Sequence, residues 1–176
     1  KGEQSFTLSG AVDSQSGISK YQYKIDDGNW TDYSGSKKIT QEGIHTVKAV
    51  AFDLAGNISA ESITTVYIDN SAPTLDLGKS NEAWTNQNVV LTVTATDELS
   101  GVKGIMLPNN TWVTGLTGTY TATENGSYSF TTEDMAGNKV VEIINVSNID
   151  KVMPTLNLSN TYTQWTNQPV LIQANA

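Results

Sequence analysis

Two pentapeptides hold the residues of this chain whose types and spacing are best suited to chemistry. They are DLAGN at Asp53–Asn57 and DMAGN at Asp134–Asn138, and they start 81 residues apart. A carboxylate in a glycine-containing loop can bind a metal ion, because Ca²⁺ takes oxygen ligands. It can also cap a tight turn, since an Asp side chain accepts backbone N–H groups and a Gly-Asn pair supplies positive-φ residues. The motif fits both interpretations, and the surrounding elements must separate them.

The spacing of 81 residues recurs along the chain, which indicates a repeated unit. Residues that match at this offset are the pairs Asp69 and Asp150, Pro73 and Pro154, and the WTNQ stretches Trp84–Gln87 and Trp165–Gln168. Two further matches have offsets of 84 and 83, namely Asp13–Ile18 with Asp97–Val102 and Glu42-Gly43 with Asn125-Gly126. Small length changes of this kind fall in loops.

The matches divide the chain into three parts. We expect a first repeat over residues 1–71 that lacks its opening strand, a second over residues 72–153, and the opening strands of a third over residues 154–176. Both ends of the sequence fall inside the pattern, so we expect a segment of a longer tandem array. A lone strand frays, so we expect Trp165–Ala176 to pair with a continuation of the chain or with a neighbouring copy by strand addition.

Within each repeat, apolar and polar residues alternate between turn signals, which predicts β-strands. Clear examples are Val89–Asp97, Gly43–Asp53 and Ile18–Trp30, the last of which contains the hairpin turn Asp-Asp-Gly-Asn. A further strand is expected over Ile58–Asp69, directly after the first AGN turn. About seven short strands in some 80 residues, with no helix, are typical of a two-sheet antiparallel sandwich. The sequence therefore predicts an all-β fold.

The composition excludes several functions. The chain has a net charge of −8, ten Lys and no Arg, so it repels a polyanion and nucleic acid is not an expected partner. It has no Cys, which excludes disulfides, thiolate-bound zinc and a thiol nucleophile. Its apolar runs are too short for a helix that spans a membrane.

The order of motifs resembles a known family. DxxSGI, YxYKIDxGxW, EGxHTVxAxAxDxAGN and xIDNxAPT follow one another from Asp13 to Thr74. This order resembles the bacterial immunoglobulin-like repeats of large exported surface proteins. The second repeat departs from it in the middle, where PNNTW replaces KIDDGNW. The resemblance implies tandem immunoglobulin-like or fibronectin III-like β-sandwiches at an extracellular or bacterial cell-surface location. Such repeats act as stalks and spacers, and sometimes as adhesive or sugar-binding modules.

The strand order of such a sandwich predicts where the aspartates lie. Asp97 and Asp134 each end a strand at the end of the second repeat where its own chain enters. They should face the tail of the first repeat, which carries Asp69. We therefore expect these three carboxylates to converge at the junction between the repeats. Asn70, and Glu42 from the far end of the first repeat, are candidates to join them.

Calcium is the functional interpretation of this junction, because Ca²⁺ requires six to eight oxygen ligands. The arrangement is similar to cadherin junctions, where an Asp-Asn-x-Pro-type linker meets Asp residues in two loops of the next domain. It departs from that pattern, since no Asp-x-Asp accompanies Asp97 and Glu42 is a loose match. The alternative interpretation is that each Asp only caps its turn, which explains the pentapeptide without a metal.

The sequence offers little for catalysis, and we expect no enzyme. His45 is the only histidine and lies in an alternating strand, where a packed or rim residue is expected rather than a catalytic base. No Ser or Thr carries a nucleophile motif, and no pair of carboxylates is placed as a glycosidase dyad. The repeated tryptophans, Trp84 with Trp165 and Trp30 with Trp112, are expected to pack in a core or between repeats.

Together these features predict a non-catalytic structural or stalk segment of an exported bacterial surface or fibre-forming protein. It would hold a functional end away from the cell or build an assembly, with adjacent repeats of the same chain as its main partners. The alternative is an adhesin or carbohydrate-binding module that uses exposed aromatic loops to bind a surface glycan or protein. A further alternative is a stalk attached to a secreted enzyme.

Overall fold

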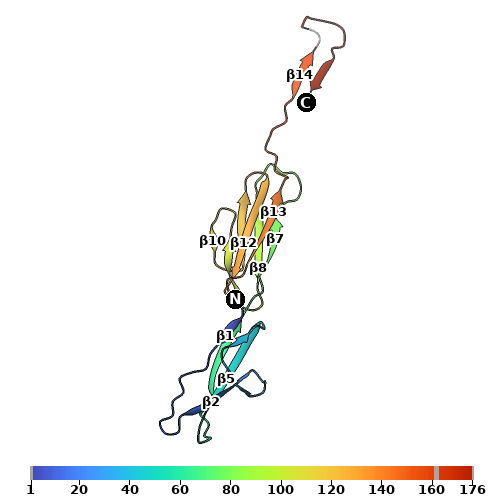
Figure 1. Cartoon of the computed structure of the whole chain (residues 1–176). Helices are drawn as coiled ribbons and strands as arrows, with labels where there is room; N and C mark the ends of the chain where they lie inside the picture. Colours follow the sequence, from blue (N-terminus) through green and yellow to red (C-terminus); the bar gives the residue numbers. More distant parts are fainter. Residues whose placement is uncertain (1, 161–162, 176) are drawn as a thin grey trace.

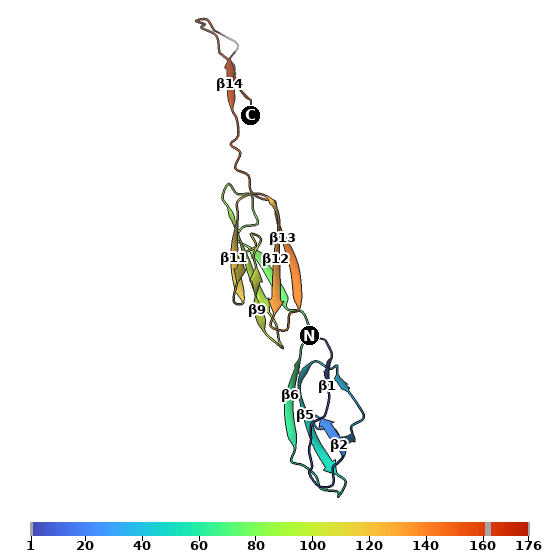
Figure 2. The same cartoon turned by 60° about the vertical axis from the view of Figure 1, so that its left-hand side comes forward.

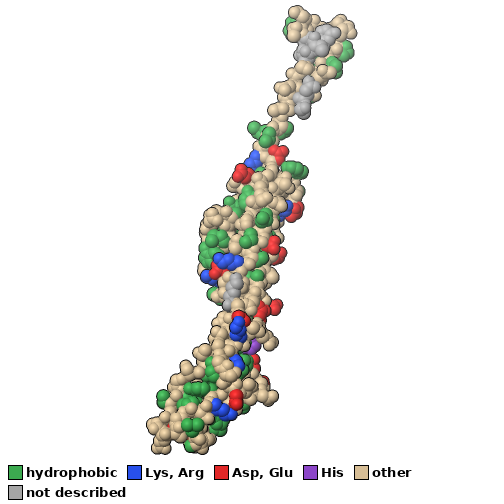
Figure 3. Space-filling view, in the orientation of Figure 1, with side chains coloured by type: hydrophobic (Ala, Val, Ile, Leu, Met, Phe, Trp, Pro, Cys, Tyr) green, Lys and Arg blue, Asp and Glu red, His purple; other side chains and the backbone are tan. Residues whose placement is uncertain are grey.

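The chain forms a row of three β-structured parts in the computed structural model, which describes residues 2–160 and 163–175. We name them the N-terminal segment (residues 2–71), the central segment (72–153) and the C-terminal segment (from 154 onward). Figures 1 and 2 show them end to end, with the central segment between the other two, and Figure 3 shows the same row in a space-filling view. All strand pairs in the sheets are antiparallel, which confirms the predicted all-β fold. In the described part of the chain, no helix is long and apolar enough to cross a membrane.

The central segment is a sandwich of a four-stranded and a three-stranded sheet. The first has the order β10-β9-β12-β13, with bounds Trp112–Val113, Val102–Met106, Gly126–Asp134 and Lys139–Val146. The second has the order β11-β8-β7, with bounds Thr117–Ala122, Val89–Thr96 and Thr74–Lys79. A parallel bridge between Thr85 and Ile149 closes one end.

The alternating sequence of β8 explains how this sandwich forms. Val89, Leu91, Val93 and Ala95 are all buried, whereas the residues between them are exposed. Successive strand residues point to opposite faces, so one face of β8 enters the core. There it meets residues of the facing sheet, among them Phe130, which is fully buried.

The N-terminal segment has a similar large sheet and a much smaller second one. The large sheet has the order β3-β2-β5-β6, with bounds Thr31–Asp32, Ile18–Ile25, Gly43–Asp53 and Ser62–Ile68. The small sheet pairs β1 (Gln4–Phe6) with β4 (Lys37–Ile39). The core cluster of buried residues in the N-terminal segment is small and consists of Ile39, Val47 and Ile68.

The C-terminal segment is a hairpin of β14 (Asn157–Asn160) and β15 (Ile172–Asn175). We expected its last residues to pair outside this sequence, but Ile172–Asn175 pairs with β14 of the same chain. The side chains described in this hairpin are exposed, including Leu158 and Ile172. Pairing with a neighbouring copy stays a proposal.

Two sequence-based expectations differ from the structure in detail. The strand expected over Ile58–Asp69 begins only at Ser62, because Ile58 forms an isolated bridge to Phe52 and the chain then leaves the ladder before β6. The expected packing of the tryptophans is wrong for Trp84 and Trp165, which are 75% and 105% exposed. Both lie in connecting chain outside the strands, where no element covers them.

Candidate metal centre

The DMAGN pentapeptide forms the turn between β12 and β13. Asn138 donates from its backbone N to Asp134 Oδ1 and from Nδ2 to Asp134 Oδ2, each at 2.8 Å. Gly137 takes a φ of 86°, which the turn requires and which L-residues rarely adopt. We expected both Gly and Asn at positive φ, but Asn138 is not among the described residues with this conformation. Its function in the turn is to donate hydrogen bonds to Asp134.

Asp97 follows β8 and caps the loop that leads into β9. The backbone N of Gly101 donates to Asp97 Oδ1 at 2.7 Å. The two loops are joined, because Met135 N donates to the Gly101 carbonyl at 2.9 Å. The ends of β8 and β12 therefore present their carboxylates at the same edge of the sandwich.

Asp69 comes from the linker between β6 and β7, and it is fixed on both sides. Ser71 N donates to its Oδ1 at 3.0 Å, and Ser100 N donates to its Oδ2 at 3.1 Å. Asn138 Nδ2 also donates to the Asp69 carbonyl at 3.3 Å. The linker is thus tied to both loops of the central segment.

One oxygen from each of Asp69, Asp97 and Asp134 lies within 4.8 Å of the other two. Asp134 is fully buried and Asp69 is 5% exposed, so water screens their charges poorly. None of the ion pairs found among residues 2–160 and 163–175 involves these three side chains. Their mutual repulsion is therefore offset only by backbone and amide N–H groups.

Glu42, which was also proposed for this site, lies outside this three-carboxylate group. Glu42 instead fixes the linker, because its carboxylate accepts hydrogen bonds from Asn70 N at 2.7 Å and from Ser71 Oγ at 3.0 Å. The Asn70 side chain accepts a hydrogen bond from Gly2 N through Oδ1. Glu42 therefore holds the linker in place, whereas Asn70 as a further ligand of the cluster stays a prediction.

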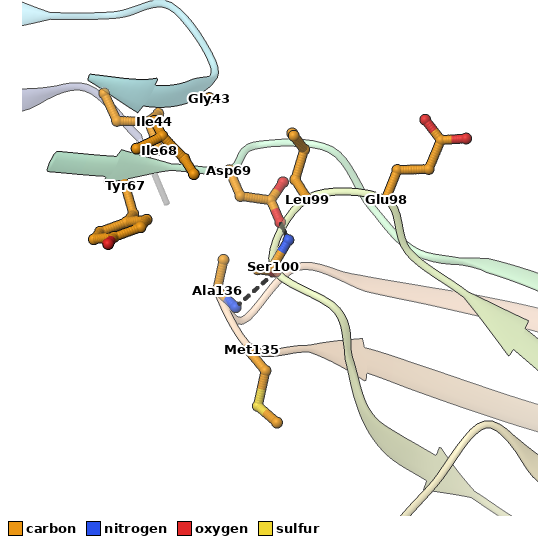
Figure 4. A pocket seen from close by; sticks show the side chains of 10 residues that line it. All are labelled: Gly43, Ile44, Tyr67, Ile68, Asp69, Glu98, Leu99, Ser100, Met135 and Ala136. Atoms are coloured by element: carbon orange, nitrogen blue, oxygen red, sulfur yellow. Dashed lines mark hydrogen bonds between the residues drawn. The ribbon is translucent and has the colours of Figure 1, made fainter. Parts of the chain in front are cut away.

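Sequence reasoning missed the contributions of Ser100 and Asn138. Ser100 donates from its backbone to Asp69 and accepts from Ala136 N through Oγ at 3.3 Å, so it bridges the linker and the DMAGN turn. Figure 4 shows both contacts. The recurrence of Ser in DxxSG and of Asn in DxAGN was the available signal.

An open pocket of about 570 Å³ lies beside the cluster, between the N-terminal and central segments. Figure 4 shows Tyr67 and Ile44 on one side and Leu99 and Met135 on the other, with Asp69 between them. These four apolar side chains are between 49% and 71% exposed. Hydrogen bonds therefore join the linker to the central segment at the acidic cluster, whereas the pocket between the apolar side chains is open.

The three-carboxylate cluster fits a hard divalent cation. All three side chains offer oxygen, and Ca²⁺ and Mg²⁺ prefer such ligands. Each carboxylate has about four lone-pair sites, so the hydrogen bonds described leave capacity for a cation. A bound Ca²⁺ would supply the positive charge that the cluster lacks, with water completing its coordination.

The DLAGN pentapeptide forms the same turn, and within residues 2–160 and 163–175 no group of three carboxylates includes its Asp53. Asn57 donates from N and Nδ2 to the two oxygens of Asp53, each at 2.7 Å. The amide of Asn57 lowers the pKa of Asp53, although the nearby charge of Asp13 opposes this. Hydrogen bonds from backbone N–H groups, that of Gly17 foremost, lower the pKa of Asp13. The partners of both carboxylates are therefore those of ordinary turn caps.

His45 is buried, which is one of the two positions expected for it. Its Nδ1 lies 2.8 Å from Asp26 Oδ2 and its Nε2 lies 2.9 Å from the Gln41 carbonyl oxygen. The hydrogen bond to Asp26 raises the pKa of His45, and the Gln41 carbonyl adds to this. The same hydrogen bond lowers the pKa of Asp26. Both ring nitrogens face acceptors, which is the arrangement of a structural ion pair.

Comparisons with known proteins assign no function to this chain, so its function has to be inferred from its own residues. No protein-family model matches the chain, and no curated protein matches it. One similar solved structure is that of fibronectin(III)-like modules of CbhA from Clostridium thermocellum, with 22% identity over 80% of this chain and 83% of that one and a TM-score of 0.39. Another is the D00-D0 domain of intimin, with 15% identity over 82% and 92% and a TM-score of 0.39. Such values transfer no function to this chain.

Proposed function

We propose that this chain is a non-catalytic spacer segment of an exported bacterial surface or fibre-forming protein. It carries load between β-sandwiches whose junction Ca²⁺ stiffens. The observation that supports this proposal is the position of Asp69. A single buried linker residue is bonded to two loops of the next sandwich and completes a three-carboxylate cluster with them.

The linker has the length and the contacts that a semi-rigid rod needs. β6 ends at Ile68 and β7 begins at Thr74, so the two sandwiches are nearly in contact. Glu42 fixes the linker from the N-terminal side, and Ser100 fixes it from the central side. Ca²⁺ bound to the three carboxylates would add a third attachment and remove their repulsion. Bending would then be limited to the side of the open apolar pocket.

Inter-segment bending tests the spacer function directly. The chain has no Cys, so one Cys placed in each sandwich can carry a fluorescent donor and an acceptor. We expect a narrow distance distribution in Ca²⁺ and a broader one in EDTA, with Asp69→Asn broad in both. Asp53→Asn is the matched control, because Asp53 lies in the same turn type far from the linker. An equally broad distribution for the wild type in Ca²⁺ and in EDTA would contradict the proposal.

The exported location has its own test. Antibody against this segment should label intact cells of the source bacterium, and protease added outside should remove the signal. Labelling that requires permeabilised cells would contradict an exposed stalk.

A second candidate function, glycan binding, is supported by the surroundings of Trp112. This ring is 37% exposed and lines a shallow pocket of about 310 Å³ with Met106 and Glu133. Lys103 and Lys139 both pair with Glu133, and Lys103 is the larger cause of its lowered pKa. An aromatic side chain beside a few polar groups is a common lining of a small-molecule site. Trp112→Ala should abolish binding to a glycan array if this function holds, whereas Trp84→Ala should not.

A further inference from the structure

The outer face of the large N-terminal sheet carries a group of lysines. Lys20 and Lys24 lie on the same side of β2, because side chains alternate along a strand, and Lys48 on β5 is the cross-strand partner of Lys24. The neighbouring cross-strand pair, Ile25 and Val47, packs in the core, so the lysines point away from it. In a chain with a net charge of −8, this grouping is a distinct local feature.

Two of these lysines have carboxylate partners of very different quality. Lys20 Nζ lies 3.0 Å from Asp32 Oδ1, which is the length of a charge-assisted hydrogen bond. Lys48 Nζ lies 3.9 Å from Glu61 Oε2, which is too long for a hydrogen bond. The charge of Lys20 is therefore paired, whereas that of Lys48 is only weakly compensated.

Lys24 has an aromatic partner in place of an acidic one. It takes part in none of the ion pairs found among residues 2–160 and 163–175. Its ammonium lies 5.3 Å from the centre of the Trp30 ring, within the range of a cation–π contact. Like charges directly opposite each other on a sheet destabilise it, so Lys24 and Lys48 oppose folding as they stand.

The central segment shows which group fits between two such lysines. On the outer face of its four-stranded sheet, Glu133 lies 2.8 Å from Lys103 Nζ and 3.1 Å from Lys139 Nζ. Trp112 lines the same shallow pocket as these three side chains. Lys103 foremost, and then Lys139, lower the pKa of Glu133 and so favour its ionised form. The central segment thus supplies its own carboxylate to a pair of lysines beside a tryptophan.

We propose that Lys24 and Lys48 bind the carboxylate of an acidic sugar, such as a hexuronic acid, with Trp30 beside the sugar ring. Residues directly opposite on paired strands have Cβ atoms about 4.5–5.5 Å apart, so both long side chains reach one carboxylate. Each ammonium has three N–H donors. The ring of Trp30 is 37% exposed and offers apolar contact to the sugar. The bound carboxylate would also remove the repulsion between the two lysines.

The surroundings favour this ligand over a polyanion or an acidic peptide. The net charge of −8 repels a dense polyanion, whereas an isolated carboxylate carries a single charge. Peptides commonly bind to a sheet by pairing with the backbone of an edge strand. β2 and β5 are the two inner strands of the order β3-β2-β5-β6, so their backbones are already paired and side chains alone face the ligand. The site is separate from the Trp112 pocket and does not rest on the spacer function.

NMR titration of the full chain with two matched probes tests the proposal. Methyl β-D-glucuronide carries the carboxylate, and methyl β-D-glucoside has the same ring without it. We expect saturable shifts of the backbone signals of Lys24 and Lys48 and of the Trp30 indole signal with the glucuronide alone. Lys24→Met and Lys48→Met should each weaken binding roughly tenfold, because each removes one charge-assisted contact.

Lys38→Met is the matched control, because it removes the same charge from β4, where Lys38 is exposed and pairs with Glu3 at 2.6 Å. Its affinity for the glucuronide should equal that of the wild type. Lys24→Glu should abolish binding and still raise the midpoint of thermal unfolding, since opposite charges would then face each other across the strands. That rise separates loss of the site from loss of the fold.

Three results would overturn the proposal. The first is equal shifts with the glucuronide and the glucoside, which would make the carboxylate irrelevant. The second is unchanged affinity in Lys24→Met and Lys48→Met. The third concerns the sugar: if acetylglutamate amide, a peptide analogue with one carboxylate, binds as tightly as the glucuronide, or if Trp30→Ala has no effect, the assignment to an acidic sugar is wrong.

Discussion

The DLAGN and DMAGN turns have the same internal hydrogen bonds and opposite surroundings. In each, the backbone N of Asn donates to one Asp oxygen and the Asn side-chain amide donates to the other, at donor–acceptor distances of 2.7–2.8 Å. Asp134 is fully buried and has two carboxylate neighbours, whereas Asp53 is partly exposed and has Asp13 nearby. The turn is therefore a property of the pentapeptide, and the candidate metal centre is a property of its position beside the Asp69 linker.

This difference separates the two interpretations of the motif. The turn-cap interpretation describes both copies, because in each the Asp accepts hydrogen bonds from the Asn and the Gly has a positive φ. Among the described residues, the calcium interpretation is supported at the second copy, where a linker adds a third carboxylate. Asp53 in the isolated chain should then behave as a capping residue alone.

Removing the two aspartates should have unequal effects on stability. Asp134→Ala leaves the buried Asn138 donors without an acceptor and should cost about 3 kcal/mol in the free energy of unfolding. Asp53→Ala should cost about 1 kcal/mol, because water can reach its partners. Urea unfolding in EDTA measures both. Equal losses would mean that the buried surroundings of Asp134 are unimportant.

The glycines of the two turns should respond alike. Gly56 and Gly137 have φ values of 91° and 86°, and an added Cβ would meet no heavy atom within 4 Å at either position. Gly→Ala at each should therefore cost about 1–2 kcal/mol from backbone strain alone. Thermal unfolding of the two variants checks this. A loss at one position only would show that the turns differ in their intrinsic geometry.

The pH dependence of stability should differ between the two sandwiches, because only the N-terminal segment contains a His. Its contact with Asp26 raises the pKa of His45 above the ordinary value of about 6.5. The protonated His45 therefore stabilises this segment fully below about pH 6.5, and the stabilisation is lost as pH rises through the folded-state pKa. The lowered pKa of Asp26 adds stability above about pH 3.9, which is lost on acidification through its folded-state pKa.

His45→Gln should flatten this pH profile on the alkaline side. The measurement is unfolding of the N-terminal segment, followed by NMR between pH 4 and 9, with the pKa of His45 read from its ring signals. An unchanged profile in the variant would exclude the His45–Asp26 pair as its cause.

The sequence predicted the positions of the strands better than the exposure of individual side chains. The strand Gly43–Asp53 was predicted to the residue, since alternation and flanking turns define it. Ile58–Glu61 was wrongly included in the strand that became β6, because the sequence pattern does not reveal that the chain leaves the ladder there. Trp84 was expected to pack, but recurrence in sequence does not distinguish a core residue from an exposed one.

The candidate site was predictable as far as topology defines it. The convergence of Asp69, Asp97 and Asp134 follows from strands that end at one edge of a sandwich. The placement of Glu42 does not, because its side chain binds the linker backbone instead of joining the three carboxylates. The contribution of Ser100 depends on how two loops dock, which no local pattern encodes.

The most direct test is titration of Ca²⁺ into the chain at concentrations where it is monomeric, followed by calorimetry. We predict one bound ion per chain, with binding weakened at least tenfold by Asp69→Asn, Asp97→Asn or Asp134→Asn and unchanged by Asp13→Asn or Asp53→Asn. The midpoint of thermal unfolding should rise with Ca²⁺ in the wild type but not in Asp69→Asn, Asp97→Asn or Asp134→Asn. Absence of binding heat and of any shift in the midpoint would contradict the account and leave DMAGN, like DLAGN, as a turn.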